Sequence, residues 1–172
     1  MRPVLAIATS FAAVVAAHAA PFDVYRGACL DTGIDLAKIR ATAASQKWLP
    51  LSDAEREQLA PGNPAAVEGW AIAKDGGRYV VSISASTAGG GAGDRSGSNV
   101  TSCSVLTPKA DEAAAVKAYG AYLKRPPAST DKADGIATYT WATQDAQSLT
   151  MHYLVAGGTL PGLSLSVSAI RK

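Results

Sequence analysis

The sequence predicts an α+β fold in which helices pack on one face of an antiparallel sheet of about six strands. Two observations support this prediction. Segments with helical spacing of apolar residues occur twice, and each is followed by three segments in which apolar and polar residues alternate. The expected order is therefore α-βββ-α-βββ. Strands that follow one another directly are typical of antiparallel pairing, whereas parallel strands need a long crossover connection.

The first helix is expected shortly after the first cysteine of the chain. Thr32 and Asp35 have the spacing of a capping box, in which side chains bond the free N–H groups of the first turn. The helical pattern ends near Trp48, ahead of a proline. A second pair with the same spacing, Ser52 and Glu55, predicts a short helical turn.

The first three strands are expected at 67–73, 79–85 and 100–106, where the pattern has a period of two. The segment 75–77, Asp-Gly-Gly, predicts a tight hairpin because these residues tolerate positive φ angles. The segment 87–99 holds five glycines and few apolar residues. We expect it to be a mobile loop between the second and third strands.

The second helix is expected to open at Thr107 and Pro108, with threonine as N-cap and proline as the first helical residue. Asp111 and Glu112 then lie in its first turns, where carboxylates favour the helix dipole. Prolines at 126–127 end the helical pattern. The last three strands are expected at 136–143, 148–155 and 163–170.

Many hydroxyl side chains occupy the strand positions that alternate with the apolar ones. A solvated face of a half-buried antiparallel sheet explains this composition. A polar face with few charges also suits contact with a protein or a glycan. These residues are Ser82, Ser84, Ser86, Thr138, Thr140, Ser148, Thr150, Ser164, Ser166 and Ser168.

Residues 1–19 have the features of a cleavable signal peptide. Arg2 supplies the positive start, and 17–19, Ala-His-Ala, places small residues at positions −3 and −1 of the cleavage site. The apolar stretch between them has about 14 residues, fewer than the roughly 20 that cross a bilayer. Residues 20–172 are therefore predicted to be a single exported domain, periplasmic or secreted, with no membrane span.

The charge of the exported domain is close to zero. The full chain carries 16 Lys and Arg against 14 Asp and Glu, and the leader contains one of the basic residues, so the formal net charge is +1. The basic residues are scattered along the sequence. Such a balance argues against a nucleic-acid partner.

Cys29 and Cys103 are the two cysteines of the chain, and we expect them to form a disulfide. A metal site would need more ligands, and the exported domain contains a single histidine, His152. No cofactor is therefore predicted. No Gly-x-Ser-x-Gly nucleophile motif or Gly-Lys-Ser/Thr phosphate loop occurs in the sequence, and the domain is not predicted to be an enzyme.

The function predicted from the sequence is non-catalytic binding outside the cytoplasm. The leading class is a protein partner, engaged as by an inhibitor or an envelope adaptor. The alternative is a small molecule or glycan in a groove between helices and sheet, and an enzyme of unknown class comes third. The candidate binding residues are mostly aromatic, and the competing interpretation is that they form part of the core. They are Trp70, Tyr139, Trp141, His152 and Tyr153.

Overall fold

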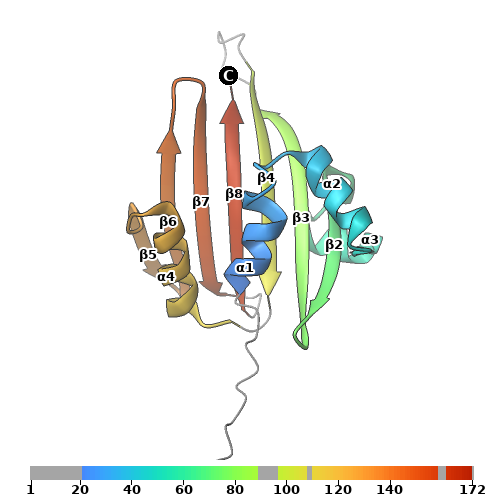
Figure 1. Ribbon diagram of the computed structural model, residues 1–172, viewed down its shortest axis with the longest axis horizontal. Helices are drawn as coiled ribbons and strands as arrows, with labels where there is room; N and C mark the ends of the chain where they lie inside the picture. Colours follow the sequence, from blue (N-terminus) through green and yellow to red (C-terminus); the bar gives the residue numbers. More distant parts are fainter. Residues whose placement is uncertain (1–20, 89–96, 108–109, 159–161, 172) are drawn as a thin grey trace, which may run out of the picture.

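The computed structural model describes residues 21–88, 97–107, 110–158 and 162–171 (Figure 1). One antiparallel sheet of eight strands has the order β1-β2-β3-β4-β8-β7-β6-β5. Its strands are β1 (Leu49–Pro50), β2 (Val67–Lys74), β3 (Gly77–Ala88), β4 (Ser98–Thr107), β5 (Ser129–Ala133), β6 (Ile136–Gln144), β7 (Ser148–Gly157) and β8 (Leu163–Arg171). The helical elements are α1 (Pro21–Tyr25), the π-helical turn η1 (Arg26–Leu30), α2 (Leu36–Ser45), α3 (Asp53–Leu59), the 3₁₀ turn η2 (Pro64–Ala66) and α4 (Glu112–Leu123).

The predicted α+β class and antiparallel sheet are confirmed. The six expected strands correspond to β2, β3, β4, β6, β7 and β8. The two additional strands, β1 and β5, are short and lie at the two edges of the sheet. Every side chain of β5 is exposed, so this strand lacks the apolar alternation from which a strand is recognised.

Two hairpins have the same turn chemistry. Asp75 and Gly76 join β2 to β3 with φ angles of 50° and 72°, as the sequence predicted. Asp134 and Gly135 join β5 to β6 with φ angles of 52° and 75°. Positive φ at both central residues gives the turn a twist that matches paired strands. The second Asp-Gly pair was therefore the signal for the β5–β6 hairpin.

The expected cap of the first helix is wrong. α2 starts at Leu36, and its N-cap is Asp35, whose side chain accepts hydrogen bonds from the backbone N–H groups of Ala37 and Lys38. Thr32 instead donates to the carbonyl oxygen of Cys29 at 2.8 Å, within the preceding turn. Residues 33–34 have positive φ and separate Thr32 from the helix.

The expected start of the second helix is also wrong. α4 starts at Glu112, and the side chain of Asp111 accepts from the N–H of Ala114 at 3.0 Å. Thr107 is the last residue of β4, where it pairs with Leu163 of β8. Sheet pairing thus fixes Thr107 in an extended conformation, and Pro108 lies outside the described residues.

The capping box at Ser52 is confirmed. The Ser52 hydroxyl accepts from the N–H of Glu55 at 3.3 Å, and the Glu55 carboxylate accepts from the N–H of Ser52 at 2.8 Å. The glycine-rich segment is shorter than expected at both ends, because β3 and β4 pair as far as Ala88 and Ser98. Residues 89–96, on which the predicted mobility depends, lie outside the described residues.

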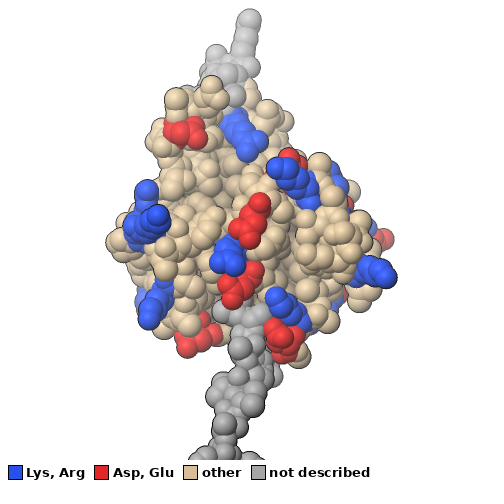
Figure 2. Space-filling view, viewed as in Figure 1, with Lys and Arg blue, Asp and Glu red and all other residues tan. Residues whose placement is uncertain are grey.

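The helices α1, α2 and α4 cover one face of the sheet (Figure 1). α1 lies over the central strands β4 and β8, with α2 on the side of β3 and α4 on the side of β6. Fully buried side chains fill the layer between helices and sheet, among them Ile39, Val81, Val105, Tyr119 and Leu165. Charged residues of both signs are dispersed over this side of the molecule (Figure 2).

α3 lies on the other face, at its edge. Leu51, just before α3, packs where a side chain on Gly69 of β2 would stand, on the face opposite the core. Glu55 of α3 pairs with Arg78, which is on the same face of β3. The chain therefore crosses from the helix-covered face to the opposite face at the sheet edge, where it forms the edge strand β1 between α2 and α3.

The predicted disulfide between Cys29 and Cys103 is present. It joins η1 to the central strand β4 across a sequence separation of 74, with the two Cα atoms 5.6 Å apart. Both residues are fully buried. Phe22 of α1 adds an edge-to-face contact with Tyr119 of α4 at 5.2 Å between ring centroids. The segment before α2 is thus held by a covalent bond and by aromatic packing.

Candidate binding hollows

The sheet face opposite α1, α2 and α4 is called the open face below. Serines of β3, β4 and β8 form rows across its centre, and the hydroxyls of Ser102 and Ser168 are 2.8 Å apart. Two of the hydroxyl residues expected on this face, Ser148 and Thr150, lie instead on the helix-covered side. Their strand positions have the parity of His152, which pairs with the core residue Val167.

A hollow of about 420 Å³ lies at one end of the open face and is called the open-face hollow. Its floor is a row across the sheet, in which Val80 of β3, Leu106 of β4 and Val155 of β7 are apolar and Ser164 of β8, between the last two, is polar. Leu59 of α3 forms one wall and Ile136 of β6 contributes to the opposite side. Because α3 packs on the open face at the edge of the sheet, it gives this row of side chains a wall and makes the surface concave.

Among the described residues, the charged groups in the lining of this hollow lie on the side of α3. The carboxylate of Glu55 accepts a hydrogen bond from the Arg78 guanidinium, and both residues line the hollow. Hydrogen bonds from the backbone N–H and then the hydroxyl of Ser52, followed by the bond from Arg78, lower the pKa of Glu55. The capping box of α3 therefore fixes the acidic partner of this ion pair.

The floor of the open-face hollow was missed in the sequence, although a signal was present. In each of the strands β3, β4 and β7, an apolar residue of the open face is next in sequence to an apolar residue of the core. These pairs interrupt the alternation at the same end of the sheet, which marks a place where both faces are apolar. The pairs are Val80 with Val81, Leu106 with Val105, and Val155 with Leu154.

A second hollow, of about 280 Å³, lies on the helix-covered side and is called the helix-side hollow. Its apolar lining comes from the end of η1, the end of α4 and strand β8, through Leu30, Leu123 and Val167. Its polar lining consists of Ser148, Thr150, His152 and Arg171. Tyr122 stands at its edge and is 42% exposed.

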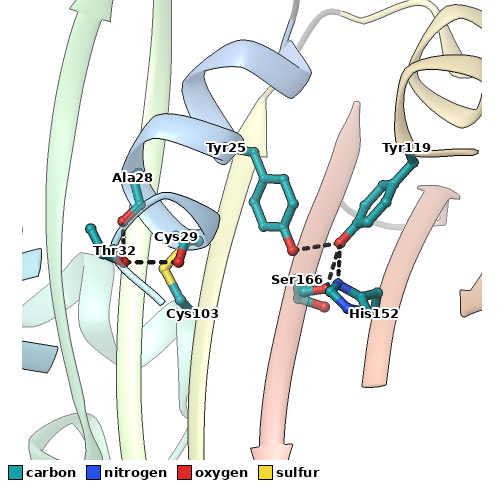
Figure 3. Close-up of a disulfide and its surroundings, with 8 residues drawn as sticks. All are labelled: Tyr25, Ala28, Cys29, Thr32, Cys103, Tyr119, His152 and Ser166. Carbon is teal, nitrogen blue, oxygen red and sulfur yellow. Dashed lines mark hydrogen bonds between the residues drawn. A yellow bond between two sulfur atoms is a disulfide. The ribbon is translucent and has the colours of Figure 1, made fainter. Parts of the chain in front are cut away.

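A buried chain of polar side chains ends at His152, which lines the helix-side hollow. Figure 3 shows the side chains of this chain. The hydroxyl of Tyr25 bonds that of Tyr119, which donates to the carbonyl oxygen of Ser166 at 3.1 Å. The same Tyr119 oxygen lies 3.5 Å from Nδ1 of His152. The ring of Tyr119 stacks on Trp141 at 4.6 Å between centroids. The chain therefore links α1, α4, β7 and β8 in the middle of the core.

Burial determines the protonation of these groups. It raises the pKa of both Tyr25 and Tyr119, so both hydroxyls keep their protons. Burial, with a smaller contribution from the positive charge of Arg125, lowers the pKa of His152 to about 4. The imidazole is therefore neutral at neutral pH.

The structure separates the five candidate binding residues. Trp70 and Trp141 are buried on the helix-covered side, and the hydroxyl of Tyr139 on the same side donates to Glu112 of α4 at 2.6 Å. His152 lines the helix-side hollow, and Tyr153 lies half-buried on the open face next to Ser166. Of the five, His152 alone lines one of the two hollows described here.

Within the described part of the chain, no three His, Cys, Asp or Glu side chains come together as a metal site would require. Among the same residues, no helix has the length and apolar character needed to span a membrane. Comparisons with protein-family models, curated proteins and solved structures found no match.

Proposed function

We propose that this domain is a non-catalytic binding protein of a periplasmic or secreted compartment, and that it takes a small apolar molecule in the open-face hollow. The observation that carries the proposal is the row of Val80, Leu106 and Val155, which gives the hollow a mostly apolar floor, with Ser164 of β8 as its one hydroxyl group, on a sheet face that is rich in serines elsewhere. Pockets for small molecules have the same character, an apolar lining with a few polar groups at defined places.

The size of the hollow supports a small ligand. About 420 Å³ falls within the range of roughly 300–1,000 Å³ that is usual for such pockets. A protein partner in a stable complex would cover about 800 Å² of the domain's surface. Such a partner would therefore also have to contact surface outside this hollow. Burial of apolar ligand surface is favourable by about 25 cal/mol per Å².

The disulfide supports the compartment. Cys29 and Cys103 are joined and fully buried. Disulfides of this kind form and persist in oxidising environments such as the periplasm and the extracellular space. This agrees with the signal peptide expected at residues 1–19.

The experiment is a titration of the secreted protein with N-phenyl-1-naphthylamine, an uncharged dye that fluoresces in apolar surroundings. We expect saturable binding of one dye per chain. Leu106→Lys should weaken it at least ten-fold, because the substitution puts a charge on the apolar floor. Val155→Trp should weaken it by filling the same space.

Val100→Lys is the matched control. Val100 is on the same strand and the same face as Leu106, about 20 Å away at 3.4 Å per residue, and it does not line the hollow. Dye affinity should be unchanged in this variant. An equal loss in Val100→Lys, or no saturable binding by the unmodified protein, would refute the proposal. Retention of a protein from envelope extract by all three variants alike would favour a protein partner instead.

A further inference from the structure

The hydrogen bonds of Tyr119 determine which nitrogen of His152 carries the proton. A tyrosine hydroxyl has one proton to donate and two lone pairs that accept. The contact at 3.1 Å is with the carbonyl oxygen of Ser166, which can only accept, so the Tyr119 proton is used there. The Tyr119 oxygen must then accept from Tyr25 and from Nδ1 of His152. This arrangement of donors and acceptors favours the tautomer of His152 with its proton on Nδ1.

The second nitrogen of the ring remains an acceptor. A neutral imidazole carries one proton, so Nε2 has a free lone pair. Among the described residues, Nε2 of His152 has no hydrogen-bond partner. In the described part of the chain, the fully buried side-chain atoms that lack a hydrogen-bond partner are Arg56 Nε and Thr101 Oγ1. Nε2 of His152 also lacks a partner but is not one of these atoms, so it is not fully buried and contacts accessible space. His152 is only 5% exposed, and that space is the helix-side hollow that it lines.

We propose that the helix-side hollow is a second binding site, which takes a small neutral molecule with hydroxyl groups, such as a monosaccharide, through a hydrogen bond to Nε2 of His152. The ligand must supply a donor because Nε2 accepts. Carboxylates lack a donor at neutral pH. Ammonium groups are disfavoured because the charge of Arg125 already acts on His152 and Arg171 lines the hollow.

The rest of the lining fits such a ligand. The hydroxyls of Ser148 and Thr150 stand on the same strand as His152 and can both donate and accept. Tyr122 presents an exposed aromatic ring at the edge, and rings of this kind combine an apolar face with a polar end. The hollow thus offers both apolar and polar surface, and its volume of about 280 Å³, just below the usual range for such pockets, restricts it to a small ligand.

The first measurement is a long-range ¹⁵N–¹H correlation spectrum of the secreted protein at neutral pH. It reports the tautomer of His152, which is assigned with a His152→Asn variant. We expect a proton on Nδ1 and an unprotonated Nε2. A proton on Nε2 would overturn the proposal.

The second measurement follows the Nε2 signal in titrations with D-glucose, with cationic D-glucosamine and with acetate, a carboxylate that has no hydroxyl group. We expect a saturable shift with glucose, an affinity at least ten-fold weaker for glucosamine because Arg171 repels its ammonium group, and no saturable shift with acetate because it has no proton to donate to Nε2. The absence of a shift with glucose, or equal shifts with all three compounds, would overturn the proposal.

Thr150→Phe should abolish the glucose shift by filling the hollow without altering the bond between His152 and Tyr119. Thr143→Phe is the matched control, because Thr143 pairs with Thr150 across the sheet and does not line the hollow. Loss of the glucose shift in both variants would place the binding elsewhere. Dye binding at the open-face hollow should persist in both, so the two sites can fail independently.

Discussion

His152 is the residue whose environment most strongly changes its chemistry. Its imidazole lies between Tyr119 and the helix-side hollow, and its pKa is lowered to about 4 by burial and by the charge of Arg125. In the described part of the chain, the other titratable groups around it are Tyr25 and Tyr119 in the buried chain, and Tyr122 and Arg171 at the hollow. The hydroxyls of Tyr25 and Tyr119 stay protonated, so neither supplies an anion that would compensate a charge on the imidazole.

The stability of the domain should therefore fall as the pH is lowered from about 6.5 to 4. The unfolded state takes up a proton on His152 near pH 6.5, whereas the folded state resists protonation until about pH 4. We expect a loss of about 2 kcal/mol in the free energy of unfolding over this range, less than the full shift gives because water reaches the ring through the hollow. Urea unfolding at a series of pH values measures it.

His152→Asn provides the control for this prediction. Asparagine keeps a donor near the Tyr119 oxygen and does not titrate. The loss between pH 6.5 and 4.5 should disappear in this variant, while carboxylates such as Glu55 and Asp145, whose pKa values are lowered, still reduce stability at more acidic pH. The same slope in both proteins would show that another group is responsible.

At the scale of elements, the sequence predicts what depends on local chemistry. The predictions of a hairpin at Asp75 and of a capping box at Ser52 were correct because each feature is determined by a few neighbouring residues. The predicted starts of α2 and α4 were wrong because each threonine has another role. Thr32 bonds a carbonyl oxygen of the preceding turn, and Thr107 pairs with a residue of β8 in the sheet. α1 was missed because a five-residue helix depends on packing against α4 rather than on its own pattern.

The element that precedes α2 should depend on its disulfide. Replacing both Cys29 and Cys103 by serine should lower the free energy of unfolding by about 2–5 kcal/mol, because the bond restricts a long loop of the unfolded chain. Guanidinium unfolding of the variant and of the oxidised protein measures the difference. The reduced, unmodified protein should lose a similar amount, and a loss below about 1 kcal/mol in both would contradict a stabilising role for the bond.

At the scale of the whole molecule, the sheet consists of two four-stranded meanders that meet at β4 and β8. Each meander has its short strand, β1 or β5, at the outer edge and follows a helical segment. This is the arrangement that two copies of one helix-plus-meander unit would give. The halves differ in α3, which lies on the open face and has no counterpart next to β5 among the described residues.

The candidate site depends on that difference, which explains why the sequence did not predict it. The floor of the open-face hollow comes from β3, β4, β8 and β7, and the row becomes a hollow only because α3 packs on the open face at the edge of the sheet. Periodicity shows which residues share a face of one strand, but the order of strands and the route of a connection are long-range properties. The aromatic candidates Trp70 and Trp141 were chosen by residue type, and the structure places them in the core.

Binding of a small apolar molecule in the open-face hollow is tested most directly by mapping where such a molecule sits. Amide and methyl spectra of the secreted, isotope-labelled protein are recorded during titration with N-phenyl-1-naphthylamine. We expect saturable shifts concentrated at Leu59, Leu106, Ile136 and Val155, with little change at Val100 and Leu149 on the far part of the same face. Shifts spread over the open face, or confined to the helix-covered side, would contradict the proposed function.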